Sequence, residues 1–257
     1  MDLGIEGKTA LVGGASTGLG FAVAQRLAQE GARLVICSRD SARIQDAAHR
    51  LSGEVLPIVC DLSDPRSIAS LVREIGDRPV DILVHNTGGP PAGSIFEFDD
   101  GEWERAHQLV LMSFVRLTRA FVPGMRRRKW GRVVTISSMS AREPADDLAL
   151  SAVYRAGALA AVRSMARACA GDNVFVNAVL PGPFSTDRWT ELVAERAARA
   201  GIAPEEMAAR THSNLPTGRP GDPRSLAATI AFLASDLNQY LSGAAIPVDG
   251  AGFRGIW

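Results

Sequence analysis

The chain has 257 residues, 46% of them hydrophobic and 22% charged, a composition that is ordinary for a soluble globular protein. Lysine plus arginine and aspartate plus glutamate both number 28, so no net charge favours binding to nucleic acid or to an anionic membrane. No apolar run approaches the ~18 residues of a membrane span, and the segment Met1–Gly4 does not begin a signal-peptide pattern.

In the first half of the chain, short apolar runs alternate with segments of helical periodicity. We predict strands over residues 9–12, 33–37, 55–60 and 80–85. The first helix, over residues 21–30, is predicted to stop at Gly31, which favours the left-handed backbone beyond a helix. Asp40 and Asp64 are the predicted N-caps of the next two helices, and Pro65 suits a first helical position.

The second half continues this alternation. In chain order we predict a helix over 100–127, a strand over 132–137, a helix over 150–170, a strand over 174–180, a helix that opens at Asp222-Pro223 and a strand over 244–248. The strands are evenly apolar, which is typical of a parallel sheet buried on both faces. The sequence therefore predicts an α/β fold: one domain over residues 1–257, with a doubly wound seven-stranded parallel sheet in three α/β/α layers.

Two segments depart from the pattern of buried strands and amphipathic helices. Residues 186–220 form a long insertion rich in alanine, arginine and glutamate. Insertions of this kind lie over the carboxyl ends of the strands in doubly wound sheets, so we predict a substrate lid there. The basic run Arg126-Arg127-Arg128-Lys129 is interpreted as a solvated helix end, where cations complement the helix dipole.

A glycine-rich loop follows the first predicted strand and leads into the first helix. Glycines at positions 14, 18 and 20 allow a tight turn and a close approach of the backbone to a pyrophosphate, and the helix N-terminus offers free amides. The alternative interpretation is a turn that binds no ligand. On the dinucleotide interpretation, the loop residues that bind the cofactor are Gly14, Ser16, Thr17, Gly18, Leu19 and Gly20.

Further motifs follow the ends of later strands: His85-Asn86-Thr87-Gly88, Ser138 and Pro181-Gly182. With the glycine spacing, they resemble the short-chain dehydrogenase/reductase (SDR) family over nearly the whole chain, and most nearly its 3-oxoacyl-acyl-carrier-protein reductase group. Gly13 stands where that family usually has threonine, and His85-Asn86-Thr87-Gly88 replaces Asn-Asn-Ala-Gly. The resemblance implies a Rossmann-type fold, an NAD(P)-dependent oxidoreductase and a homotetramer or homodimer.

The end of the second strand indicates which dinucleotide is bound. An acidic residue there would bond the ribose hydroxyls of NAD, whereas Ser38 and Arg39 suit the 2′-phosphate of NADP, so NADP(H) is favoured over NAD(H). The alternative is an exposed arginine without a ligand. The resemblance further implies contacts of Asp61-Leu62 with the adenine ring and of Thr186 with the nicotinamide carboxamide. It places Asn86 and Gly88 near the adenosine, and adds Pro181 and Gly182 as cofactor-binding residues.

The catalytic positions depart most from the family, which uses serine, tyrosine, lysine and asparagine. Ser138 matches the serine, but the tyrosine, lysine and asparagine positions hold Ser151, Arg155 and Val110. A serine hydroxyl does not ionise usefully near neutral pH, and arginine cannot pass a proton on. Arg155 remains a candidate ligand for ribose hydroxyls or a phosphate, and Tyr154, on the same helix, is a candidate replacement acid.

Three functions fit an intact cofactor loop with altered catalytic positions. The first is a carbonyl reductase or alcohol dehydrogenase that acts on a small molecule through Ser138, Ser151, Tyr154 and Arg155. The second is a non-catalytic NADP-binding sensor or partner subunit, and the third a lyase or dehydratase. The three cysteines lack metal-ligand spacing, so we expect no metal site and reduced thiols in a cytoplasmic protein.

Overall fold

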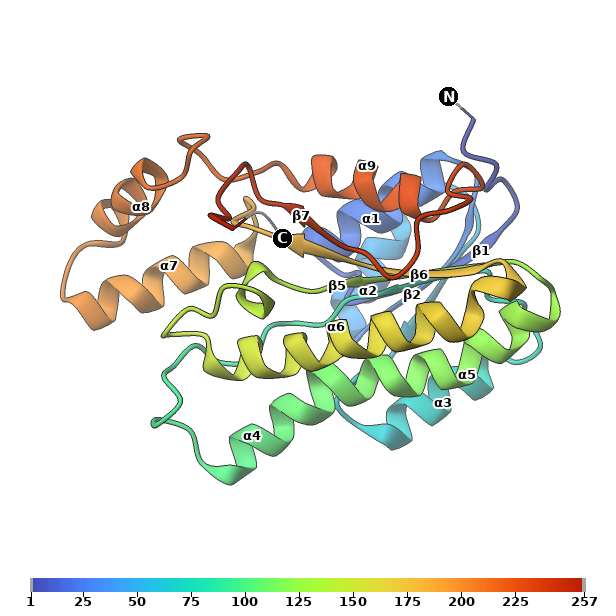
Figure 1. Ribbon diagram of the computed structural model, residues 1–257, viewed down its shortest axis with the longest axis horizontal. Coiled ribbons are helices and arrows are strands. Elements are labelled where there is room, and N and C mark those ends of the chain that lie inside the picture. The colour runs from blue at the N-terminus through green and yellow to red at the C-terminus, as the bar shows by residue number, and fades with distance from the viewer. Residues whose placement is uncertain (1, 256–257) are drawn as a thin grey trace.

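The centre of the molecule is a parallel sheet of seven strands in the order β3-β2-β1-β4-β5-β6-β7 (Figure 1). The computed structural model describes residues 2–255. The strands are β1 (Thr9–Gly13), β2 (Arg33–Ser38), β3 (Val55–Val59), β4 (Ile82–His85), β5 (Gly131–Ile136), β6 (Val174–Pro181) and β7 (Ala245–Val248). Every residue of β1, β4 and β5 is buried, because helices cover both faces of the sheet. The predicted α/β fold with a seven-stranded parallel sheet is confirmed.

Helices form the two outer layers (Figure 1). One layer contains α1 (Gly18–Gln29), α2 (Ser41–Arg50) and α9 (Pro223–Leu233); the other contains α3 (Pro65–Ile75), α5 (Ser113–Arg127) and α6 (Ala149–Cys169). Each helical layer encloses a hydrophobic core against its face of the sheet. In β1, Ala10 and Val12 pack against the layer of α1 and α9, and Leu11 packs against the layer of α3 and α5, because successive side chains of a strand point to opposite faces. The predicted three-layer architecture is confirmed.

Local capping residues fix where several helices begin and end. The carboxylates of Asp40, Asp64 and Asp222 each accept a hydrogen bond from a backbone N–H in the first turn of the helix that follows. Gly31, just past α1, has a φ of +81°. These predicted boundaries are confirmed, while α1 begins earlier than predicted, at Gly18, because the glycine loop turns directly into the helix.

The predicted helix over residues 100–127 is helical throughout but changes its type in the middle. It consists of α4 (Asp100–Ala106), the π-helix η1 (His107–Met112) and α5. Asp99 and Glu102 form a capping box at its start. Sequence periodicity predicts an α-helix and does not reveal the π-helical segment, which places Val110 in the interior.

The segment predicted as a lid contains two helices, α7 (Asp187–Ala200) and α8 (Pro204–Ser213). Both lie beyond the carboxyl ends of the strands, at one end of the molecule (Figure 1). Two short 3-10 helices, η2 (Met139–Ala141) and η3 (Ala170–Asp172), follow β5 and α6.

The basic run at the end of α5 is an exposed helix end, as predicted, and it also forms ion pairs that the sequence did not reveal. Arg126 and Lys129 both pair with Asp172 of η3. Arg128 pairs with Asp81 at 3.0 Å and donates to the carbonyl of Val80. The run therefore connects α5 to neighbouring segments, because the tertiary fold brings acceptors beside a helix end that the sequence shows only as cationic.

Candidate active site

The glycine loop lies where the strand order of the sheet reverses, between β1 and β4, and ligands of doubly wound sheets bind at this point. Gly14 and Gly18 have φ angles of +55° and +59°. A Cβ atom added to Gly20 would lie 2.2 Å from the carbonyl oxygen of Gly14. The Asn86 amide donates to the carbonyls of Gly13 and Gly14, at 3.2 Å each, and so fixes the loop against the end of β4.

The start of α1 is suited to an anionic ligand. Thr17 is the N-cap residue, but its side chain makes no capping hydrogen bond, so the first amides of the helix remain available. Ser16, Gly18 and Leu19 are partly exposed beside it. A helix N-terminus next to glycines with free amides fits a pyrophosphate group.

The residues predicted to select the dinucleotide lie at the carboxyl end of β2. Ser38 donates from its hydroxyl to the carbonyl of Asp40 at 3.2 Å. Arg39 is exposed, and its guanidinium forms no ion pair with any residue in the 2–255 range. A free cation here fits the 2′-phosphate of NADP.

Most other predicted cofactor residues surround the same loop. Leu62 lies 3.1 Å, and Thr186 3.6 Å, from the positions that added Cβ atoms would take on Gly13 and Gly18. The Asp61 carboxylate accepts from the N–H and the hydroxyl of Ser63. Gly88 follows β4, Pro181 is the last residue of β6 and Gly182 follows it, and β4 and β6 flank β5 on its two sides. The fold therefore brings together segments that are far apart in the sequence, and their individual roles remain predictions.

Three serines and an arginine are connected by hydrogen bonds at the end of β5. The Ser140 hydroxyl lies 2.9 Å from the Ser138 hydroxyl and 3.3 Å from that of Ser151, and Arg155 Nε donates to Ser151 Oγ at 3.1 Å. We did not predict Ser140. Its only sequence signal is its position two residues after Ser138, within the turn that η2 forms.

Arg155 points into the protein. Its Nη1 donates to the carbonyls of Ile136 and Ser137, at 2.8 and 2.9 Å. Burial lowers the pKa of Arg155 to about 10, so the side chain is still a cation near neutral pH. The contact with ribose or phosphate that the sequence suggested is thus unavailable to Nε and Nη1, which are already engaged.

His85 belongs to a separate buried network. Its Nε2 lies 2.8 Å from Ser113 Oγ, and its Nδ1 lies 2.9 Å from Thr135 Oγ1. The Ser113 hydroxyl donates to the Leu109 carbonyl, so it accepts from His85 Nε2–H, and Thr135 in turn donates to Nδ1. Burial, and secondarily the charge of Arg155, lower the pKa of His85 to about 3, so the imidazole is neutral and structural.

Tyr154 faces a different part of the structure from Ser151 and Arg155. Its ring packs against Trp103 of α4 at 5.8 Å and against His107 at 5.5 Å between centroids. Within the described residues, its hydroxyl makes no hydrogen bond to the serine group. Desolvation and the nearby Glu104 raise the pKa of Tyr154. Its role as a replacement acid stays a prediction that this geometry does not support.

Three arginines of α7 connect this helix to the loops that follow β4 and β5. Arg196 binds both carboxylate oxygens of Asp147, at 2.7 and 3.1 Å. Arg188 and Arg199 donate to the carbonyls of Pro90 and Ala92. The same loops meet in a short parallel bridge between Gly93 and Leu148. The candidate lid is therefore held against the loops that follow β4 and β5.

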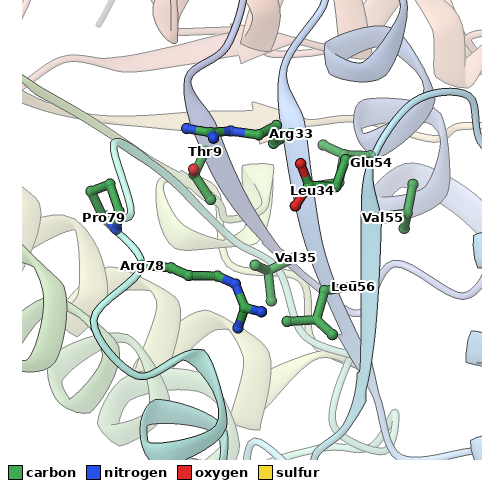
Figure 2. Close-up of a pocket in the computed structure, with 9 residues that line it drawn as sticks. All are labelled: Thr9, Arg33, Leu34, Val35, Glu54, Val55, Leu56, Arg78 and Pro79. Atoms are coloured by element: carbon green, nitrogen blue, oxygen red, sulfur yellow. The ribbon is translucent and has the colours of Figure 1, made fainter.

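Two cavities lie at opposite edges of the sheet. One, of about 230 Å³, is lined by the amino ends of β1, β2 and β3 together with Arg78 and Pro79 (Figure 2). It is remote from the glycine loop, which follows the carboxyl end of β1. The other, of about 260 Å³, lies between Phe184, Leu215 and Val248, next to the segment that follows β6.

No group of three or more histidine, cysteine, aspartate or glutamate side chains among residues 2–255 is arranged to hold a metal ion. None of the helices described is both long and apolar enough to cross a membrane.

Comparisons with known proteins place these features in context. A family model described as enoyl-(acyl carrier protein) reductase matches residues 14–253. The 3-oxoacyl-[acyl-carrier-protein] reductase FabG of Vibrio cholerae is 32% identical over 250 residues, which cover 96% of this chain and 98% of that protein.

Solved structures agree with this match. L-sorbose reductase from Gluconobacter frateurii, complexed with NADPH and L-sorbose, superposes with a TM-score of 0.93 and 30% identity, covering 100% of both chains. A 3-oxoacyl (acyl-carrier-protein) reductase from Agrobacterium tumefaciens C58 with NADP bound superposes with a TM-score of 0.88 and 30% identity, covering 97% of this chain and 95% of that one.

Proposed function

The chain belongs to the short-chain dehydrogenase/reductase family, and we propose that it is an NADP(H)-dependent oxidoreductase that reduces a small carbonyl compound or oxidises the corresponding alcohol. The observation that supports this most is the common location of the glycine loop and Ser138. Both follow carboxyl ends of central strands, β1 and β5, on either side of β4. Relatives named as a 3-oxoacyl thioester reductase and a sugar reductase suggest a small ketone as substrate.

The proposed cofactor contacts follow from the geometry of the loop. The amides at the start of α1 would bind the pyrophosphate, and Arg39 with Ser38 would bind the 2′-phosphate. Bound NADPH would supply a hydride to the carbonyl carbon of the substrate. The absence of a competing carboxylate partner for Arg39 in the described residues supports NADPH over NADH.

The side chains near Ser138 define what the protein itself contributes. Ser138 would donate a hydrogen bond to the substrate oxygen, while Val110, Ser151 and Arg155 supply no group that ionises in the useful range. Loss of a positioned acid typically costs about 10²–10⁴ in rate, so we propose a slow enzyme that depends on positioning and electrostatic stabilisation. Residues 186–220 would close over the substrate as a lid.

A second candidate is a non-catalytic NADP-binding sensor or partner subunit. The inward direction of Arg155 favours it, because the three bonds of Nε and Nη1 hold that cation away from a ligand. Both candidates require the same cofactor site.

We also propose a homotetramer or homodimer in the cytoplasm. Exposed apolar side chains on α6 and around α9 support an assembly that covers them: Val153, Phe232, Leu237 and Tyr240. Cys37, Cys60 and Cys169 are buried free thiols, in keeping with a reducing compartment.

The test is calorimetric titration of the purified protein with NADPH and NADH, followed by turnover assays on 3-oxoacyl thioesters and ketoses. Preferential binding of NADPH with turnover is the expected result. Tight binding without turnover across the panel would favour the sensor, and absence of binding to either dinucleotide would overturn both candidates.

A further inference from the structure

A row of hydrogen-bonded side chains runs from the protein interior to Ser138, which follows the end of β5. Arg155, Ser151 and Ser140 are buried, whereas Ser138 is half-buried. Each neighbour in the row is within hydrogen-bond distance of the next, at 3.1, 3.3 and 2.9 Å from Arg155 outward. Only the last hydroxyl is therefore accessible to a ligand.

The chemistry of Arg155 gives this row a direction. A guanidinium has donors and no acceptor, so Ser151 Oγ must accept from Arg155 Nε. The single hydrogen of Ser151 is then free to reach Ser140, and the hydrogen of Ser140 is donated to Ser138. Ser138 Oγ also accepts from the backbone N–H of Ser140 at 3.1 Å. With two hydrogen bonds accepted, its own hydrogen is left to point outward.

We infer that Arg155, Ser151 and Ser140 are positioning residues that orient the Ser138 hydroxyl as a hydrogen-bond donor towards the substrate oxygen. Each hydroxyl that accepts a hydrogen bond becomes a stronger donor, so the row polarises Ser138 as well as orienting it. The identity of the substrate oxygen rests on the proposed function, whereas the orientation of Ser138 does not.

The same row cannot conduct a proton inward, because it ends at a group that only donates. A bound NADPH would supply the hydride, and the Ser138 hydroxyl would stabilise the negative charge that then develops on the substrate oxygen by donating a hydrogen bond to it. A solvent water would supply the proton of the alcohol and leave as hydroxide. The substituted site thus keeps the stabilisation of charge and gives up the protein-bound acid.

The orientation can be tested without substrate by introducing a titratable group with Ser138→Cys. The thiolate at this position would accept from Ser140, so Ser140→Ala in this background should raise the pKa of the introduced thiol by about one unit. Ser140→Thr, which restores a hydroxyl, should return it. The pKa is measured from the pH dependence of alkylation, in which the three buried native cysteines react slowly.

Position in the row is tested by combining substitutions. Ser151→Ala, or Arg155→Lys, should raise the thiol pKa by less than Ser140→Ala does, and neither should add to the effect of Ser140→Ala. Ser137→Ala is the matched control, because this neighbouring buried hydroxyl has no partner among the described residues. Equal thiol pKa values in all variants, or additive shifts, would overturn the inference.

Turnover gives a second readout. Ser140→Ala should lower kcat about tenfold with no change in the Kd of NADPH, and it should have no further effect in the Ser138→Ala background. Additive losses would again contradict the directed row. If the unmodified protein turns over no carbonyl substrate, the proposed function fails, while the thiol titration still decides the orientation of Ser138.

Discussion

Two arginines near the carboxyl ends of the strands, Arg39 after β2 and Arg155 on α6, differ in how their charge is used. Arg39 is exposed and unpaired within the described chain, whereas Arg155 is buried and donates three hydrogen bonds. The same type of side chain thus serves as a candidate ligand for an anion in one place and as an internal donor in the other. His85 is also buried, and there the loss of hydration keeps the ring neutral.

Replacement of Arg39 should change the preference between dinucleotides. Arg39→Ala removes the proposed charge-assisted hydrogen bonds to the 2′-phosphate, of about 1.5–3 kcal/mol, so the Kd of NADPH should rise roughly 10–100-fold. The Kd of NADH should stay the same, because NADH lacks that phosphate. Arg43→Ala, one turn into α2, is the control. Equal weakening of both dinucleotides in calorimetry would contradict the assignment.

His85 should make the folded protein sensitive to acid. Its pKa is about 3 in the folded state against 6.5 as the ordinary value. As the pH falls through 6.5, His85 binds a proton in the unfolded chain but stays neutral in the folded chain. The free energy of unfolding therefore declines by up to about 1.4 kcal/mol per pH unit until about pH 3. Denaturant unfolding across this range should show a shallower pH dependence for His85→Asn. Parallel curves would mean that His85 is protonated in the fold.

Whole elements position the site by packing and by interactions between loops. The glycine loop folds tightly on the start of α1, so a methyl group on Gly20 would lie 2.2 Å from the Gly14 carbonyl oxygen and 2.7 Å from the Asn86 amide nitrogen. Helix α7 is held in a different way, by arginine contacts with the loops after β4 and β5. The first arrangement is rigid, whereas the second depends on partly exposed polar contacts that can open at lower cost.

Substitution in the glycine loop should affect both dinucleotides together. Gly20→Ala would place a methyl group 2.2 Å from the carbonyl oxygen of Gly14, so the loop must shift and the affinity for NADPH and for NADH should fall. Gly171→Ala is the matched control, since its added methyl group would meet nothing within 4 Å. Unchanged binding by the Gly20 variant in calorimetry would show that the loop does not hold the cofactor.

The bidentate pair between Arg196 and Asp147 should determine how often α7 opens. Arg196→Met removes it, and amide hydrogen exchange over residues 187–200 should accelerate several-fold, with little change in other helices. Arg210→Met is the control, because its pair with Glu206 lies within α8. If exchange in α7 accelerates equally in both variants, the contact with Asp147 does not hold this helix.

At the scale of the whole molecule, several exposed apolar side chains lie on two outer helices and next to them: Val153 on α6, Phe232 on α9, and Leu237 and Tyr240 just after α9. Val59, Ile95 and Phe96 are exposed elsewhere. Tyr240 is 99% exposed, and Val153 and Phe232 are 48% and 43% exposed. Helices α6 and α9 belong to the two helical layers that cover the opposite faces of the sheet (Figure 1). An oligomer formed through these helices would remove that surface from water.

A charge placed on α6 should therefore separate the subunits. Val153→Glu is expected to reduce the mass measured by sedimentation equilibrium towards that of a single chain, while circular dichroism stays unchanged. Val59→Glu, at a comparably exposed valine at the end of β3, should leave the mass as it is. A single-chain mass for the unmodified protein would refute the proposed assembly.

The sequence by itself determined the order of strands and helices, the parallel sheet and the position of the glycine loop. Apolar runs, capping residues such as Asp40 and Asp64, and Gly31 act over a few neighbours, so their effect can be read locally. The substitutions at Ser151 and Arg155 were equally visible, because they depart from a spacing that the rest of the chain keeps.

Only the tertiary structure decided how these side chains are directed. Arg155 finds its acceptors at Ile136 and Ser137, 19 and 18 residues away, and Ser140 enters the row because η2 turns it back towards Ser138. Tyr154 precedes Arg155 directly, yet it packs against Trp103 because neighbouring positions of a helix face different directions. Side-chain direction depends on partners that folding brings together, and no local pattern in the sequence contains them.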